Sequence, residues 1–116
     1  MIVSVRVAKL LQKLGYNVAC IDEYWTFENS PINATHPYLE GEYKKIPKNL
    51  RISAPTPYQA LEWLWEHDLT RISLVTEREK PIARAKIKHN GMEIEISGDS
   101  PGCAIYNCLE LIERSW

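Results

Sequence analysis

The pair Asn90-Gly91 constrains the fold more than any other feature of this sequence, because it separates two stretches that resemble β-strands. Asn-Gly favours the tight two-residue turn of a β-hairpin. The flanking stretches, 82–88 and 92–97, alternate apolar with charged residues, as strands buried on one face do. The sequence therefore predicts an antiparallel hairpin centred on this pair.

A two-residue turn would also fix the register of the hairpin. One face would be apolar, and the other would carry two pairs of opposite charge, each worth roughly 0.2–1 kcal/mol. The predicted cross-strand pairs are Lys88 with Glu93, Lys86 with Glu95, Ile87 with Ile94 and Ala85 with Ile96.

The residues around the hairpin predict a third strand and two helices. Residues 71–77 are rich in β-formers and precede the polar turn 78–81. Thr56-Pro57-Tyr58-Gln59 has the pattern of a capping box with proline at the first helical position, so a helix is expected from there to about His67. Asp99 or Ser100 would cap a last helix that begins at Pro101. The C-terminal order is thus α-β-β-β-α.

The apolar spacing of these two helices predicts which side of each is buried. In the first, Tyr58, Leu61, Leu64 and Trp65 share a face, and Trp63 points to the opposite side. In the last helix the expected buried residues are Ile105, Cys108, Leu109, Ile112 and Trp116.

The first half is less regular. Ser4 can cap a helix whose apolar residues recur at helical spacing up to Leu14, and Gly15 would end it. A strand is expected somewhere within 17–27. Residues 28–57 hold five of the seven prolines, so we expect an irregular segment at about 28–55, in which 39–43 could form a short edge strand.

These patterns together predict one α+β domain over residues 1–116. Its centre is a three-stranded antiparallel sheet with helices on one face. Strands of the first half could extend the sheet to four or five. A chain of this length can bury a core without a disulfide or a metal.

Composition excludes several classes of function. The net charge of −1 lacks the positive field that phosphate binding requires, so a nucleic-acid partner is not expected. Three cysteines, an odd number, favour a reducing cytoplasmic location over a disulfide framework. We expect no signal peptide, no membrane span and no cofactor, because the sequence shows no charged leader, long apolar run or phosphate-binding loop. Homodimerisation through a sheet edge stays open.

The candidates for chemistry are few. Cys103 lies in the first turn of the last helix, where a thiol becomes more acidic, and it is the strongest candidate for a nucleophile. No base is predictable near it, and His89, on the apolar side of the hairpin, is expected to be a half-buried structural residue. Glu40 and Glu42 would share a face, but we interpret them as residues of an exposed strand edge. Cysteine and histidine spacing predicts no metal site.

Aromatic residues outside the predicted core stripes form the other candidate site. Interfaces are enriched in Trp and Tyr, so these residues are candidates for binding a protein partner. The alternative for Trp63 is that it packs beneath the irregular segment in a small second core. The candidates are Trp63, Trp25, Tyr38 and Tyr43.

The stretches 3–16 and 53–64 resemble a recurring pattern in small uncharacterised proteins of gut Bacteroidetes and of their prophages or mobile elements. In that pattern a capped helix, a glycine, an aromatic stretch, Ala-Pro-Thr and a Trp-containing helix follow in order. Cys103, Tyr106 and Cys108 depart from its alanine-rich last helix. The resemblance implies no activity. We expect a non-enzymatic accessory or protein-interaction domain, with a small enzyme using Cys103 as the alternative.

Overall fold

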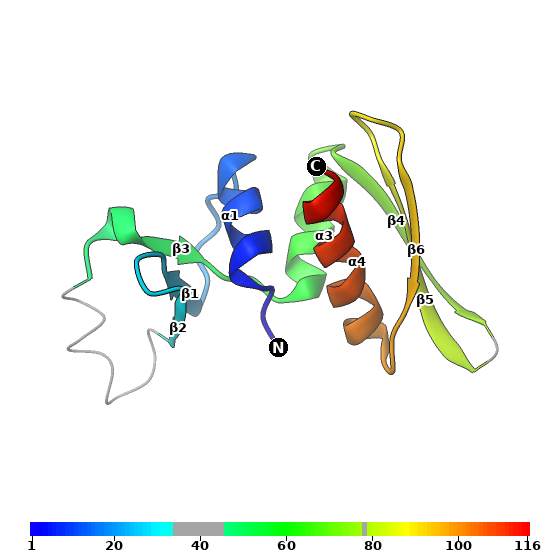
Figure 1. Cartoon of the computed structure of the whole chain (residues 1–116), viewed down its shortest axis with the longest axis horizontal. Coiled ribbons are helices and arrows are strands. Elements are labelled where there is room, and N and C mark those ends of the chain that lie inside the picture. Colours follow the sequence, from blue (N-terminus) through cyan, green and yellow to red (C-terminus); the bar gives the residue numbers. More distant parts are fainter. Residues whose placement is uncertain (34–45, 78) are drawn as a thin grey trace. The chain divides into compact units, whose positions relative to one another are not determined.

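The computed structural model describes residues 1–33, 46–77 and 79–116, and its fold is α+β (Figure 1). Within these ranges the strands form two separate antiparallel sheets of three strands each. The chain divides into two compact units, Met1–Thr56 (the first unit) and Pro57–Trp116 (the second unit). That both units make up a single domain stays a prediction.

Helix α1, Val5–Lys13, opens the first unit as the sequence predicts. The Ser4 hydroxyl accepts a hydrogen bond from the Val7 amide at 3.3 Å, which satisfies one of the free N–H groups at the start of the helix. Gly15 follows the helix with φ +103°, a conformation that glycine adopts without strain. The predicted N-terminal cap and C-terminal stop are both confirmed.

The sheet of the first unit has the strand order β2-β1-β3. Strand β1, Asp22–Trp25, lies inside the predicted range 17–27. Strands β2, Ser30–Asn33, and β3, Arg51–Ser53, and the short helix η1, Lys48–Leu50, occupy part of 28–55, where the sequence predicts irregular structure. The edge strand expected at 39–43 lies outside the described residues.

The N-terminal segment is tied into the first unit through Val3, which has no exposed surface. The Val3 amide donates to the Pro55 carbonyl at 2.9 Å. The hydroxyl of Tyr24 on β1 donates to the Val3 carbonyl at 2.6 Å. One buried residue therefore joins the start of the chain to the middle and to the end of this unit.

The second unit has the predicted order α-β-β-β-α. Strands β4, Thr70–Glu77, β5, Lys80–Ile87, and β6, Glu93–Ser97, form an antiparallel sheet in the order β4-β5-β6. Helix α4, Pro101–Ser115, packs on β5 and β6, and helix α3, Pro57–Glu66, packs on α4 and β4. Among the described residues no strand of the first unit extends this sheet, so it stays three-stranded.

The hairpin β5–β6 forms with a register that differs from the predicted one by two residues. Lys86 lies opposite Glu93 and Arg84 opposite Glu95, in place of Lys88 and Lys86. The connection is longer than two residues, because the Ile87 amide bonds to the Met92 carbonyl at 2.9 Å. The Asn90 side chain accepts from the Met92 amide, also at 2.9 Å. A shift of two residues keeps every side chain on its face, so hydrophobic pattern alone could not exclude it.

The predicted buried face of α3 is right for Leu64 and wrong for Tyr58 and Trp65. The helix buries Pro57, Ala60, Trp63 and Leu64. Tyr58 and Trp65, which were expected inside, are 52% and 57% exposed. Both sides of this helix carry large apolar residues. The small residue Ala60 lies on the buried side of the helix. A small side chain lets a neighbouring element approach closely, which favours packing on this side.

Helix α4 agrees well with the sequence. The Ser100 hydroxyl accepts from the Cys103 amide at 3.1 Å and so caps the helix. The helix buries Ile105, Cys108, Leu109 and Ile112 as expected, together with Ala104. Trp116, predicted to be buried, is only half-buried.

Candidate functional site

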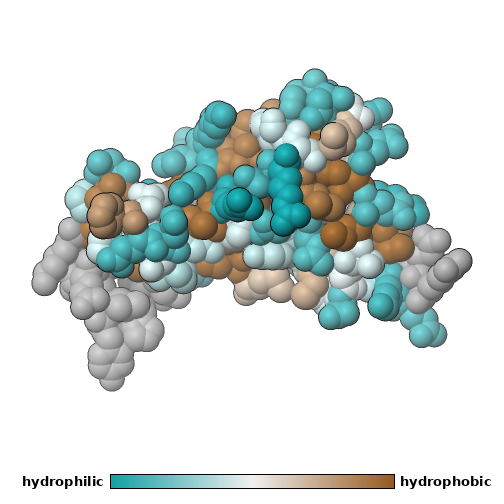
Figure 2. Space-filling view, in the orientation of Figure 1, coloured by the Kyte–Doolittle hydropathy of each residue, from teal (hydrophilic) through white to brown (hydrophobic). Residues whose placement is uncertain are grey.

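An exposed aromatic face runs along helix α3. This face is formed by three residues at helical spacing that point away from the packed residues: Tyr58, Leu61 and Trp65. They line a hollow of about 340 Å³, which we call the helix hollow. Glu62 and Glu66 complete its rim. Figure 2 shows one face of the molecule, on which hydrophobic residues form patches between hydrophilic ones.

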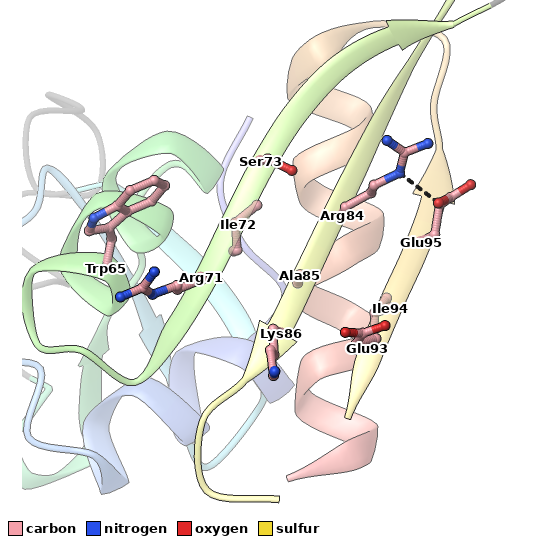
Figure 3. A pocket seen from close by; sticks show the side chains of 10 residues that line it. All are labelled: Trp65, Arg71, Ile72, Ser73, Arg84, Ala85, Lys86, Glu93, Ile94 and Glu95. Atoms are coloured by element: carbon pink, nitrogen blue, oxygen red, sulfur yellow. Dashed lines mark hydrogen bonds and ion pairs between the residues drawn. The ribbon is translucent and has the colours of Figure 1, made fainter. Parts of the chain in front are cut away.

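A second hollow, of about 510 Å³, lies on the face of the sheet that α4 does not cover; we call it the sheet hollow (Figure 3). Trp65 also lines this hollow and therefore connects it with the helix hollow. The other side chains come from β4, β5 and β6. They include Arg71, Ser73, Arg84, Lys86, Glu93 and Glu95.

In the sheet hollow the acidic residues lie on β6 and the basic residues on β4 and β5. The acidic residues Glu93 and Glu95 both lie on β6. On β5, Arg84 is held by Glu95, with Nε to Oε2 at 2.6 Å. Arg71 on β4 lies directly opposite Lys86 on β5. The hollow thus has an acidic side on β6, Lys86 lies between Glu93 and Arg71, and Arg71 lies next to Trp65.

A neighbouring lysine is already engaged by an acid. Lys88 Nζ lies 2.9 Å from Oδ1 of Asp68, in the loop between α3 and β4. The hydrogen bond and the charge of Lys88 lower the pKa of Asp68 below its ordinary value. In the part of the chain that the structure describes, neither Arg71 nor Lys86 lies within ion-pair distance of an acid, but the charge of Arg71 also lowers the pKa of Asp68, and Glu93 lies opposite Lys86 on β6.

The structure describes two of the four aromatic residues predicted to bind a partner. Trp63 is 7% exposed, and its ring stacks on His67 with centroids 4.2 Å apart. This burial agrees with the alternative that Trp63 packs in a core. Trp25 on β1 is half-buried, 6.4 Å from the ring of Phe27. Tyr38 and Tyr43 lie outside the described residues.

Sequence reasoning missed Tyr58 and Trp65 as surface residues. Their spacing of seven is as compatible with a buried stripe as with an exposed one. The signal that separates the two faces is the small residue Ala60, since the helix face that approaches its neighbours needs a small side chain. The position of Arg71 opposite Lys86 could not be assigned because the register between β4 and β5 was not predicted.

The residues considered for catalysis do not assemble into a site. Cys103 is half-buried in the first turn of α4. His89 is exposed, and its ring lies 4.3 Å from that of Trp116, beyond the last residue of the same helix. The two are separated by almost the whole length of a helix that rises about 1.5 Å per residue, so His89 cannot act as a base for Cys103. Glu40 and Glu42 lie outside the described residues.

The most buried thiol is that of Cys108, on the packed side of α4. Burial raises the pKa of Cys108 to about 11, so the thiol stays protonated at neutral pH. No group of three or more His, Cys, Asp or Glu within residues 1–33, 46–77 and 79–116 could hold a metal ion. In the same ranges, every helix is too short or too polar to cross a membrane.

Comparison with known proteins gives no match to the sequence or to the fold. No family model matches the sequence, no curated protein matches it, and no solved structure matches its fold.

Proposed function

We propose that this protein is a non-enzymatic interaction protein whose second unit binds a protein partner through the aromatic face of α3. One observation carries the proposal. Tyr58 and Trp65 expose about half of their surface on one helix, whose opposite face is packed with Trp63 and Leu64. Large aromatic side chains that line a surface hollow are typical anchors of protein interfaces.

The rim of the helix hollow fits the same role. Glu62 and Glu66 flank the apolar residues, which gives the centre and border that interfaces have: an apolar middle surrounded by polar groups. The separation of Cys103 from His89 favours binding over catalysis. The resemblance to proteins of mobile elements supports an accessory role in such an element, which is part of this proposal.

Site-specific photo-crosslinking tests the proposal. The photoreactive amino acid benzoylphenylalanine is placed at Tyr58 in one variant and at Phe27 in another, and each is irradiated in a lysate of the source organism. Phe27 is a matched control, because it is an aromatic residue of the first unit with 78% exposure. We expect a defined adduct with one protein from position 58 and none from position 27.

A second substitution identifies the surface. Trp65→Ala, introduced into the variant with the crosslinker at Tyr58, should abolish the adduct while the circular dichroism spectrum stays unchanged. Equal crosslinking from positions 58 and 27, or an adduct that does not depend on Trp65, would contradict the proposal.

A further inference from the structure

We infer that the sheet hollow binds an acidic segment of the partner protein, with a carboxylate between Arg71 and Lys86 and a neighbouring apolar side chain on Trp65. This inference rests on the proposed function and deepens it, because it states the chemistry of the partner.

The like-charged pair is the first observation. Arg71 and Lys86 occupy directly opposite positions on adjacent strands, and like charges in this position destabilise a sheet. Glu93, on the other side of Lys86, compensates the charge of Lys86 in part. An anion bound between them would remove this repulsion and add charge-assisted hydrogen bonds. Each of the other basic residues nearby, Arg84 and Lys88, already has an acidic partner at 2.6 and 2.9 Å.

The second observation is the aromatic residue beside the pair. The Arg71 side chain extends from β4 toward Trp65 (Figure 3). Trp65 lines both hollows, so a chain that crosses from one to the other passes its ring. The site therefore offers a contact for an apolar residue and a contact for an acid within one short segment.

The remaining charges favour a protein over a nucleic acid. Glu93 and Glu95 line the same hollow as the basic pair. They would repel the evenly spaced phosphates of a nucleic acid strand. A peptide can place an acidic residue near Arg71 and a neutral or basic residue near β6. With acidic residues on β6 and Arg71 on β4, the hollow therefore fits a partner whose charge varies along its length.

Fluorescence anisotropy with labelled peptides tests the inference. The probes are a short peptide in which Leu alternates with Glu, a peptide of equal length in which Leu alternates with Lys, and a single-stranded oligonucleotide. We expect the acidic peptide to bind most tightly. Its binding should weaken as salt is added, since exposed charges are screened.

Charge reversal locates the binding. Arg71→Glu and Lys86→Glu should each weaken binding of the acidic peptide by about tenfold or more, as expected for the loss of a hydrogen bond between charged groups. Lys80→Glu is the matched control, because Lys80 is an exposed residue of β5 outside both hollows. It changes the net charge equally and should leave the affinity unchanged.

Three results would overturn the inference: equal effects of the three reversals, tighter binding of the basic peptide, or tighter binding of the oligonucleotide. The crosslinking experiment separates this outcome from failure of the proposed function. If the adduct at position 58 depends on Trp65 but survives Arg71→Glu with Lys86→Glu, the interaction surface stands and the acidic segment does not.

Discussion

Two tryptophans two positions apart on α3 have opposite environments. Trp63 is buried and stacks on His67, and Trp65 is 57% exposed. We expect Trp63→Ala to lower the free energy of unfolding by about 3–5 kcal/mol, as removal of a buried aromatic side chain does. Trp65→Ala should change it by less than about 0.5 kcal/mol, as is usual for surface positions.

Urea unfolding followed by circular dichroism measures both variants without relying on tryptophan fluorescence. Loss of a cooperative transition in Trp63→Ala would agree with the expected direction. Equal costs for the two substitutions would show that the assignment of the two faces of α3 is incorrect.

Gly98 and Gly102 flank the turn from β6 into α4 and differ in the space around them. A Cβ atom on Gly98 would lie 2.7 Å from the carbonyl carbon of Cys103, whereas one on Gly102 would meet nothing closer than 3.8 Å. Gly98→Ala should therefore cost about 1–3 kcal/mol, as overpacking does. Gly102→Ala, inside the helix, should be stabilising by up to about 1 kcal/mol. Thermal unfolding of both variants measures the difference, and a neutral Gly98→Ala would contradict this close approach.

At the scale of elements, the sequence predicted local features better than pairings. Ser4, Ser100 and Asn90 each accept a hydrogen bond from a backbone amide within three residues, so these roles can be read from the neighbouring sequence. The bond from Asn90 Nδ2 to the Ser115 carbonyl, at 3.0 Å, could not be read in this way. The pairing of β1 with β3 joins Tyr24 to Ile52, and no local pattern specifies a partner so far along the chain. The predicted register of β5–β6 was wrong for another reason. Two registers that differ by two residues place the same side chains on the same face of the sheet.

The candidate site was also predicted in its local features and not in its long-range contacts. The sequence identified exposed aromatics as the most informative residues, but it selected Trp63 in place of Trp65. Both residues are large, and only the neighbours of each position decide which one packs. The like-charged pair of Arg71 and Lys86 depends on the register between β4 and β5, which hydrophobic alternation does not determine.

A double-mutant cycle distinguishes the two registers of the hairpin. In the structure Glu95 pairs with Arg84, whereas a two-residue turn would pair it with Lys86. We expect a coupling free energy of about 0.2–1 kcal/mol between Arg84→Ala and Glu95→Ala, as exposed ion pairs give. Coupling between Lys86→Ala and Glu95→Ala should be close to zero, and the reverse result would support the two-residue turn. Urea unfolding of the single and double variants supplies the measurement.

At the scale of the whole molecule, each unit has its own sheet and its own buried residues. The second unit packs Ala85 and Ile94 of its sheet beneath the buried side of α4, and β4 packs against α3. We therefore expect a fragment of residues 57–116 to fold alone. Its stability should be small, because a chain of about 60 residues buries only about 60% of its unfolded surface.

Circular dichroism during heating and a proton–nitrogen NMR spectrum of this fragment test the expectation. A cooperative transition with dispersed amide signals would establish that the second unit folds independently. A featureless melt with collapsed signals would show that it needs the first unit.

The burial of Val3 makes the first unit depend on the short segment that precedes α1. A proteolytic cut between Val3 and α1 would release the amide that donates to the Pro55 carbonyl and the carbonyl that accepts from the Tyr24 hydroxyl. Each lost hydrogen bond costs about 0.5–1.5 kcal/mol, a large share of the stability of a small protein. The lifetime of this unit in a cell would then depend on the peptide bonds beside α1, although most of its buried side chains lie far along the chain.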